Sequence, residues 1–370
     1  MPTPPPEASF KGMRLATIRG VPVYVGSSWA ILALIIVALT GPDIARSRPD
    51  LGVLAYGVAM LYAVMLLVAV LVHEAAHAVT ARGFDYPVHR VVADLWGGHT
   101  ALDVTKASPG RSALVALAGP AANGLLALVG FGLTGVLPDG VPGGLAAGFG
   151  WLNGALALFN LLPGLPLDGG QLVEAGVWGA TGSRARARVA AGSCGLVVTV
   201  TVVAVAVGVP LLRGETPSLF TLGWSLMIAW FLWQGARAAI AVGKGNAQIE
   251  KLRVLDVLTP VAAVPMSARL ADFPSGLAPV LVDDAGVPIA LVDAEALARI
   301  PPQAYPHTLA SAVSRRQPPH WVLEVDPSAA LAEILPTLAA VGTGVVAVCQ
   351  KGQVLGVVTI ATVNGAAAHR

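Results

Sequence analysis

Two histidines and a glutamate lie within five residues of one another, in the sequence His73-Glu74-Ala75-Ala76-His77. Residues four apart lie on the same face of a helix, so both imidazoles can reach one metal ion. Glu74 is then placed to take a proton from a water molecule bound to that metal. This is the His-Glu-x-x-His pattern of zinc-dependent peptide hydrolysis, and it predicts a catalytic zinc site.

These three side chains lie in an apolar run, Leu51 to Ala81, that contains no other Asp, Glu, Lys, Arg or His. A charged group inside a bilayer is costly, so its presence indicates a functional site. At a rise of ~1.5 Å per residue, His77 and His73 lie about 6 and 12 Å from Ala81. The site is therefore expected inside the bilayer, nearer one surface. The alternative is a histidine pair that is hydrogen-bonded to neighbouring backbone carbonyls.

Zinc needs a third protein ligand if a water molecule is to keep the fourth position. The best candidate is Asp168, which lies in the segment NLLPGLPLDGG from Asn160 to Gly170. Prolines interrupt the preceding helix, and glycines allow close approach to other backbone. Irregular backbone at membrane depth must be buried in protein or line a wet cavity, which gives a carboxylate there a purpose. The alternative is a surface aspartate in a loop that ends a helix.

The composition predicts an α-helical polytopic membrane protein. The chain has 370 residues, of which 55% are hydrophobic and 12% charged, too apolar for an average soluble domain. Apolar runs that are long enough to cross hydrocarbon number about six. They are Ser28 to Thr40, Leu51 to Ala81, Ser112 to Leu137, Gly144 to Leu162, Val189 to Leu212 and Leu219 to Ala236.

The positive charges predict the orientation of these helices. If the N-terminus is cytoplasmic, the inner segments contain 14 Lys and Arg residues, whereas the outer loops contain 3, namely Arg46, Arg48 and Arg213. This asymmetry predicts a multi-pass protein of the cell membrane, embedded in the lipid bilayer with both termini in the cytoplasm. The net charge of +2 gives no reason to expect a nucleic-acid partner.

The composition changes after Gly243. Pro, Asp and Glu become more common, and the apolar runs shorten to the length of strands that alternate with short helical stretches. We therefore expect two domains, a membrane-embedded domain over residues 1–243 and a cytoplasmic α/β domain over residues 244–370. The second has an ordinary domain size.

The motifs described above, the six spans and the sequence GPAAN from Gly119 to Asn123 together resemble the site-2 protease family of intramembrane zinc metalloproteases. The resemblance covers most of the membrane part of the chain. It implies that His73, His77 and Asp168 bind zinc, with one ion per chain, and that Glu74 is the general base.

Members of this family carry a glycine-rich re-entrant β-hairpin after the second helix, and the segment from Leu95 to Thr100 looks like that element. The resemblance implies that Gly97 and Gly98 belong to an edge strand that is presented to an unwound substrate. His99 stands where an apolar or small residue is expected, and it is either a polar neighbour of the site or a fourth metal contact. Asn123 would help to position the substrate or an oxyanion, and the alternative is a role in helix packing.

Two segments of the C-terminal part, Val254 to Pro260 and Gly352 to Thr359, look like the opening and closing segments of a paired cystathionine-beta-synthase (CBS) module. Some site-2 proteases carry such a module after the last helix. It implies a regulatory domain in which Thr359 contacts an adenine nucleotide. The closing motif of the family would have an Asp at Thr362, so pairing of two chains into a homodimer is an equal alternative to nucleotide sensing.

We therefore expect a metalloendopeptidase that hydrolyses a peptide bond in or near a transmembrane segment, with Glu74 moving the proton from water to the leaving amine. By analogy with the family, its substrate is a single-span membrane protein such as an anti-sigma factor, in regulated intramembrane proteolysis. The competing hypothesis is a CBS-gated transporter or channel, in which His73, Glu74 and His77 relay ions or protons. A transporter would show paired broken helices, whereas one break is evident, from Pro163 to Gly170.

Overall fold

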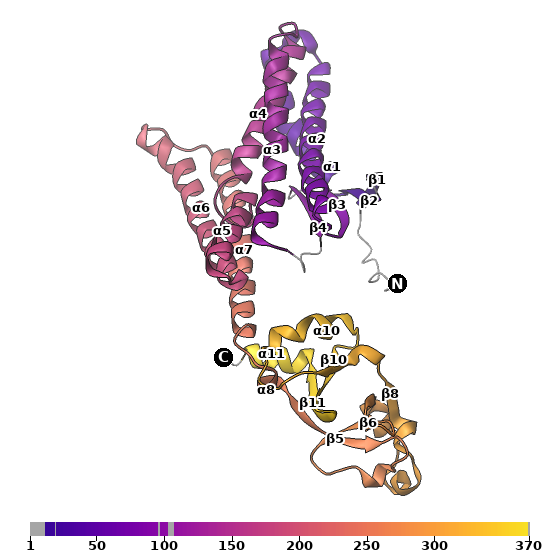
Figure 1. Cartoon of the computed structure of the whole chain (residues 1–370). Coiled ribbons are helices and arrows are strands. Elements are labelled where there is room, and N and C mark those ends of the chain that lie inside the picture. Colours follow the sequence, from indigo (N-terminus) through magenta and orange to yellow (C-terminus); the bar gives the residue numbers. More distant parts are fainter. Residues whose placement is uncertain (1–11, 19, 95–96, 103–106, 369–370) are drawn as a thin grey trace. The chain divides into compact units, whose positions relative to one another are not determined.

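The computed structural model of the chain describes residues 12–18, 20–94, 97–102 and 107–368. The chain folds into two compact units, Met1–Gly243 and Lys244–Arg370. Long helices make up most of the first unit, and the second unit combines strands with short helices (Figure 1).

Among the described residues, the first unit is built from seven α-helices. They are α1 (Trp29–Ser47), α2 (Leu54–Gly83), α3 (Pro109–Thr134), α4 (Val141–Asn160), α5 (Asp168–Thr181), α6 (Arg184–Leu212) and α7 (Leu219–Ile249). Five of these described helices, α1, α2, α3, α6 and α7, are long and apolar enough to cross a membrane. The predicted polytopic helical architecture is confirmed.

Two helices differ from the sequence expectation in physically simple ways. α4 occupies the fourth predicted run and has 20 residues, but it is not among the five described helices that are long and apolar enough to cross a membrane. α6 begins at Arg184 rather than Val189, because Ser183 caps it by accepting a hydrogen bond from the Arg186 amide (3.2 Å). The predicted run begins at Val189 because it contains no charged residues, but arginine is a good helix former, so the helix extends back through Arg188 to Arg184.

The sequence did not predict α5 at all. This helix has 14 residues, three of its first nine are glycine, and at ~1.5 Å per residue it is too short to cross a bilayer. Its N-terminus nevertheless matters most for the chemistry, because Asp168 is its first residue.

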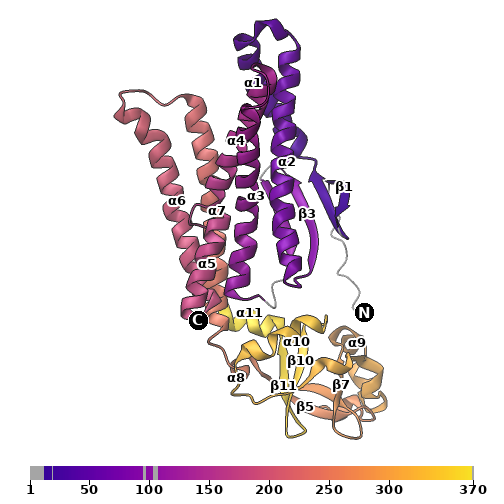
Figure 2. The ribbon, with the colours of Figure 1, turned by 45° about the horizontal axis from the view of Figure 1, so that its top comes forward.

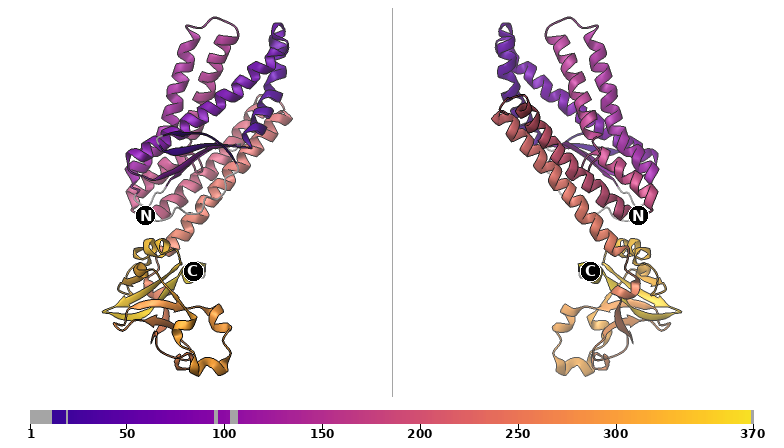
Figure 3. Two further views of the ribbon diagram at one scale, coloured as in Figure 1. Left: turned by 90° about the vertical axis from the view of Figure 1, so that its right-hand side faces the viewer. Right: turned by 90° about the vertical axis from the view of Figure 1, so that its left-hand side faces the viewer.

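α3 contacts α2, α4 and α5, and so lies at the centre of the first unit. Figure 3 shows α3 and α4 side by side as a hairpin, and Figure 2 shows α5, α6 and α7 grouped beside them. Glycines allow the close approach: a Cβ added at Gly130 would lie 2.5 Å from the Gly150 nitrogen. α3 can therefore touch several functional residues at once.

The described residues also form a four-stranded sheet beside α2, in the order β1-β2-β3-β4. The strands are β1 (Gly12–Ile18), β2 (Val21–Gly26), β3 (Val88–Asp94) and β4 (Gly97–Leu102). Val21, Val23 and Val91 form a buried cluster with Ala78, which packs the sheet against α2. β3 and β4 are antiparallel, and Asp94 pairs with Gly97. The hairpin expected after the second helix is therefore present.

The second unit contains a seven-stranded sheet, in the order β8-β7-β6-β5-β11-β10-β9 as far as its described residues extend. Its strands are β5 (Thr259–Pro265), β6 (Ala278–Val282), β7 (Pro288–Val292), β8 (Ser314–Arg316), β9 (Val322–Glu324), β10 (Val345–Gln350) and β11 (Gln353–Thr359). Its helices are α8 (Val254–Val257), α9 (Ala294–Ala298), α10 (Leu335–Ala340) and α11 (Ile360–Ala368). Trp321, Leu331 and Ile334 are among its fully buried side chains. The predicted α/β class of this part is confirmed.

Candidate metal centre

The face of α2 that carries the histidine motif is buried. His73, Glu74 and His77 are 5%, 6% and 7% exposed, and one donor atom from each lies within 4.8 Å of the others. α2 ends at Gly83, so at ~1.5 Å per residue His77 and His73 lie about 9 and 15 Å from that end. The cluster therefore lies well inside the helix rather than at its surface terminus.

Asp168 reaches the same place from a different part of the chain. α4 ends at Asn160, and the chain packs against itself before α5 begins: a Cβ at Gly169 or Gly170 would collide with backbone atoms of residues 161–165. The two glycines thus permit a turn that larger residues would not fit. The turn leaves the Asp168 side chain 7% exposed at a helix N-terminus, where backbone N–H groups favour a carboxylate.

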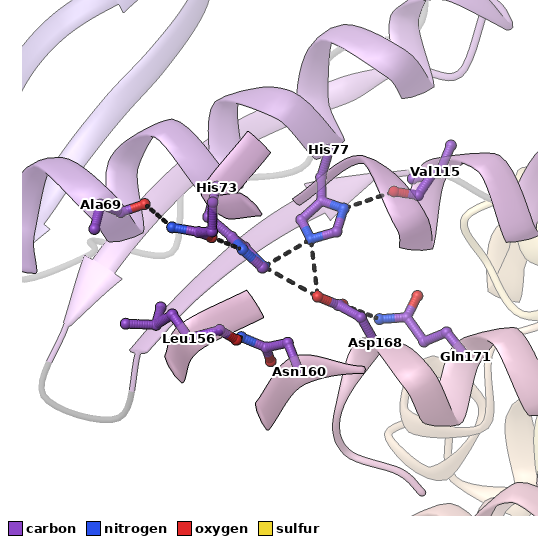
Figure 4. A network of polar contacts seen from close by, with 9 residues as sticks. Ala69, His73, His77, Val115, Leu156, Asn160, Asp168 and Gln171 are labelled. Carbon is purple, nitrogen blue, oxygen red and sulfur yellow. Dashed lines mark hydrogen bonds and ion pairs between the residues drawn. The ribbon is translucent and has the colours of Figure 1, made fainter. Parts of the chain in front are cut away.

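The three predicted metal ligands converge. The Nε2 atoms of His73 and His77 are 3.0 Å apart, and Asp168 Oδ2 lies 3.0 Å from the first and 3.3 Å from the second (Figure 4). Residues 95 positions apart in the sequence therefore present two nitrogens and one oxygen to a single point.

The hydrogen bonds on the far side of each imidazole define its tautomer. His73 Nδ1 donates to Asn123 Oδ1 (2.5 Å), and His77 Nδ1 donates to the Val115 carbonyl (2.7 Å). Both partners are oxygens that can only accept here, so both Nδ1 atoms carry the proton. Both Nε2 atoms then present lone pairs, which is the arrangement that outer partners of metal-binding histidines impose.

This donor set fits zinc. Tetrahedral ligands about 2.0–2.2 Å from zinc lie about 3.3–3.6 Å from one another, near the separations of 3.0–3.3 Å found here. Two imidazole nitrogens and one carboxylate are also the ligand types that catalytic zinc sites use. Three lone pairs facing one point repel one another unless a cation lies between them, so His73, His77 and Asp168 are suited to hold zinc.

Two further residues support the ligands. Gln171, one turn along α5, donates from Nε2 to Asp168 Oδ1 (3.2 Å), which leaves Oδ2 directed at the histidines. Gly119 on α3 lies against both imidazoles, and a Cβ there would be 2.5 Å from His73 Nε2. The helix approaches the site this closely because position 119 has no side chain.

Asn123 contacts His73 directly, and its amide nitrogen is fully used. Asn123 Nδ2 donates to Asn153 Oδ1 (2.8 Å) and to the Ala69 carbonyl (3.3 Å). An oxyanion would need an N–H donor, and both hydrogens of this amide already have acceptors. These bonds give Asn123 a supporting role beside His73, and a role in positioning a substrate or an oxyanion stays a prediction.

A cavity of about 410 Å³ adjoins the site between α3, α5 and α7. Its wall includes Val115, whose carbonyl binds His77, and Gln171, which binds Asp168. The cavity also contains a charged group at Glu174, which is 9% exposed and pairs with Arg184 (3.4 Å). The cavity lining includes none of the proposed ligands, but the cavity is large enough to hold water beside the residues that support them.

The glycine-rich hairpin is described only in its backbone. Gly97 and Gly98 begin β4, which is an edge strand of the sheet that the described residues form. The side chain of His99 and the whole of Leu95 and Trp96 lie outside the described residues, so the role of His99 as a metal contact stays a prediction.

Thr359 has a local partner in the second unit. Its Oγ1 accepts from the Thr362 amide (3.0 Å), and the Thr362 hydroxyl donates to the Thr359 carbonyl (2.9 Å). These bonds cap the start of α11, which is a structural use of both threonines. Contact between Thr359 and an adenine nucleotide stays a prediction.

Sequence reasoning missed three supporting residues, Val115, Asn153 and Gln171. A backbone carbonyl such as that of Val115 has no sequence signature. Asn153 could have been noticed, because a fully polar amide in a predicted membrane span is unusual. Gln171 could have been noticed from its position one helical turn after Asp168.

The comparisons with known proteins agree with this site. The family model Peptidase family M50 matches residues 61–142 and 140–205, which contain the histidine motif and Asp168. A protein of Synechocystis sp. named as a zinc metalloprotease is 29% identical over 266 residues, covering 70% of this chain and 68% of that protein. Rip3 of Mycobacterium tuberculosis, also named as a zinc metalloprotease, is 34% identical over 204 residues, covering 53% of this chain and 50% of Rip3.

Parts of the chain are similar to solved structures. A site-2 protease from Methanocaldococcus jannaschii matches with a TM-score of 0.44 and 19% identity, covering 62% of this chain and 95% of that protein. The CBS domain of a membrane protein from Sphaerobacter thermophilus matches with a TM-score of 0.27 and 19% identity, covering 35% of this chain and 96% of that domain.

The family resemblance rests on the sequence matches, and the geometry of the ligands agrees with it. The matched region contains every residue of the converging donor set, and both relatives are named for the zinc chemistry to which that set is suited. Residues 61–205 of the chain are therefore similar to peptidase family M50, and the donor set that suits zinc lies within this region.

Proposed function

We propose that this metalloendopeptidase hydrolyses a peptide bond in or near the transmembrane segment of another membrane protein, with one zinc ion per chain held by His73, His77 and Asp168. One observation carries the proposal: two imidazole nitrogens and one carboxylate oxygen meet within 3.3 Å of one another inside a bundle of apolar helices. A site at that depth is accessible to peptide bonds that lie in the bilayer.

Glu74 is the general base and acid of the proposed reaction. It is buried beside the ligands, with a carboxylate oxygen within 4.8 Å of ring nitrogens of both histidines. Zinc, when bound, lowers the pKa of a coordinated water and polarises the scissile carbonyl. Glu74 accepts the proton of the attacking water and donates it to the leaving amide nitrogen.

The substrate of this reaction must present an extended segment. A transmembrane helix keeps its carbonyls in hydrogen bonds, so local unwinding has to precede cleavage. β4 offers the backbone groups of an edge strand, and Gly97 and Gly98 at its start leave room for a second strand beside it. We therefore infer a single-span membrane-protein substrate, of which an anti-sigma factor is one example, with helix-weakening residues near the site.

The proposed location is the cell membrane, in multi-pass form with both termini in the cytoplasm. The support is the excess of Lys and Arg in alternate segments, including Arg82 at the end of α2 and Arg184 at the start of α6. Labelling of single cysteines introduced at Arg46 and at Arg186 tests this, because the two positions are expected on opposite sides.

For the second unit we propose regulation through its CBS-like sheet, by an adenine nucleotide near Thr359 or by pairing of two chains. The support is the resemblance of its opening and closing segments to that module. Calorimetric titration with ATP and AMP tests nucleotide binding, and light scattering of the detergent-purified protein tests pairing.

The decisive experiment is zinc analysis of the purified protein beside His77→Ala and Asp168→Ala, together with cleavage of single-span substrates by wild type and Glu74→Gln. We expect one zinc per wild-type chain, loss of zinc in both ligand variants, and retained zinc without cleavage in Glu74→Gln. Zinc-free wild-type protein, purified without chelators, would refute the proposed ligand set.

A further inference from the structure

Two asparagines, Asn123 on α3 and Asn153 on α4, carry a chain of hydrogen bonds to the metal centre. Asn153 Nδ2 donates to the Phe149 carbonyl (3.0 Å), and Asn123 Nδ2 donates to Asn153 Oδ1 (2.8 Å). His73 Nδ1 in turn donates to Asn123 Oδ1 (2.5 Å). Both asparagines are 0% exposed, so bulk water does not reach them.

The direction of this chain is defined at its α4 end. A backbone carbonyl such as Phe149 O can only accept, so the amide nitrogen of Asn153 must point towards it. The Asn153 oxygen then points towards Asn123 and requires a donor from it. The oxygen of Asn123 is consequently the atom left to face His73.

The orientation of the Asn123 amide decides whether His73 can bind a metal. With the oxygen towards His73, the ring keeps its proton on Nδ1 and offers a lone pair at Nε2. With the amide reversed, an N–H would face Nδ1, and the ring would satisfy it by moving its proton to Nε2. A protonated Nε2 of a neutral ring has no lone pair for zinc.

Asn123 has a second acceptor, the Ala69 carbonyl, but it is the weaker of the two. The distance to it is 3.3 Å, against 2.8 Å for Asn153 Oδ1. The stronger constraint on the Asn123 amide is therefore Asn153.

We propose that Asn153 is a positioning residue for the metal centre, which fixes the amide of Asn123 and thereby keeps the Nε2 lone pair of His73 directed at the metal. Its side chain bonds to Asn123 and to the Phe149 carbonyl, so it acts on His73 through Asn123. The inference rests on the zinc ligands named under the proposed function.

The test compares two replacements of nearly equal shape. Asn153→Leu removes the acceptor, whereas a buried Asn153→Asp stays protonated and keeps one acceptor and one donor in the same plane. Ser225→Ala is the matched control, because Ser225 is a 6% exposed residue of α7 whose hydroxyl makes one bond within its own helix (2.6 Å). The zinc dissociation constant is measured by competition with a chromophoric chelator, and the visible spectrum of the Co²⁺-loaded protein reports the ligand geometry.

We expect Asn153→Leu to bind zinc about tenfold more weakly, at the low end of the effect of outer partners of metal ligands. The Co²⁺ spectrum should change with it, Asn153→Asp should restore both, and Ser225→Ala should alter neither. In an Asn123→Leu background, Asn153→Leu should have no further effect on zinc affinity, since the two residues act in series.

Unchanged zinc affinity and an unchanged Co²⁺ spectrum in Asn153→Leu would overturn the inference. A loss of zinc affinity that Asn153→Asp does not restore would also overturn it, and so would a loss that adds fully to that of Asn123→Leu. These outcomes leave the zinc ligands themselves intact. Failure of the wild-type protein to bind zinc would instead refute the proposed function, so the two failures are distinguishable.

Discussion

Replacing Gly119 by alanine would place a methyl group between α3 and the two imidazoles of α2. The added Cβ would lie 2.5 Å from His73 Nε2 and 2.7 Å from His73 Cε1, and it would also overlap His77 Nε2. Ordinary contacts between heavy atoms are about 3.5–4.0 Å. The His73 ring, or the whole of α3, would therefore have to retreat by about 1 Å.

A shift of that size is large for a metal site, in which ligand distances are held to within about 0.2 Å. We expect Gly119→Ala to weaken zinc binding by about 100-fold, which corresponds to displacement of at least one nitrogen ligand from its position. Crowding of this kind should also lower the stability of the metal-free protein by about 1–3 kcal/mol.

The assay is the zinc dissociation constant of detergent-purified protein, measured beside the thermal unfolding of its metal-free form. Gly124→Ala is the matched control, because Gly124 lies on the same helix and a Cβ there meets no atom within 4 Å. The control should bind zinc like the wild type and gain up to about 1 kcal/mol from the better helix former. Wild-type zinc affinity in Gly119→Ala would show that α3 does not press on the imidazoles as described.

Four more results are expected. Chelation should lower the melting temperature, and zinc at 100 times its dissociation constant should restore about 2.7 kcal/mol of stability; an unchanged melting temperature would contradict a structural link between metal and fold. Gln171→Leu should weaken zinc binding about tenfold in a chelator competition, less than Asp168→Ala, because it removes one hydrogen bond (3.2 Å) and no ligand. Trp321→Phe should destabilise the second unit by about 1 kcal/mol in denaturant unfolding of the full chain, since the 1% exposed indole loses its hydrogen bond to a carbonyl of β7 (3.0 Å). The Ser328 hydroxyl and amide donate to Asp326 and hold the pKa of its carboxyl below the ordinary value. This turn therefore stabilises the fold above the ordinary carboxyl pKa, and the stabilisation is lost as pH falls through the lowered pKa. Asp326→Asn should make the free energy of unfolding less dependent on pH in the acid range.

The sequence carried most of what locates the metal centre. The four-residue spacing of His73 and His77 corresponds to one helical turn, which the structure has, and the proline and glycine residues around Asp168 predicted an interruption that the structure also has. These features are local, because each depends on neighbours within about ten residues. Local patterns are the part of a fold that a single sequence records best.

The parts that the sequence did not reveal depend on helices that meet in space. The bond between Asn123 and Asn153 joins residues 30 positions apart, and the bond between His77 and the Val115 carbonyl joins residues 38 positions apart. No spacing rule relates such pairs. α5 was missed for another reason: its glycines and Glu174 give neither an apolar run nor a strong helical pattern, so packing against α3 and α6 has to favour the helix.

α3 contributes none of the predicted ligands, yet Val115, Gly119 and Asn123 all face the centre from it at intervals of four residues. They form a single stripe, so turning the helix about its own axis would alter all three contacts together. A rotation of about 20° moves atoms some 3 Å from the axis by about 1 Å, enough to break a hydrogen bond. One small rotation of α3 would therefore change three contacts together: the bond from His73 to Asn123, the bond from His77 to the Val115 carbonyl, and the close approach of Gly119 to both rings. None of the ligands would have to change.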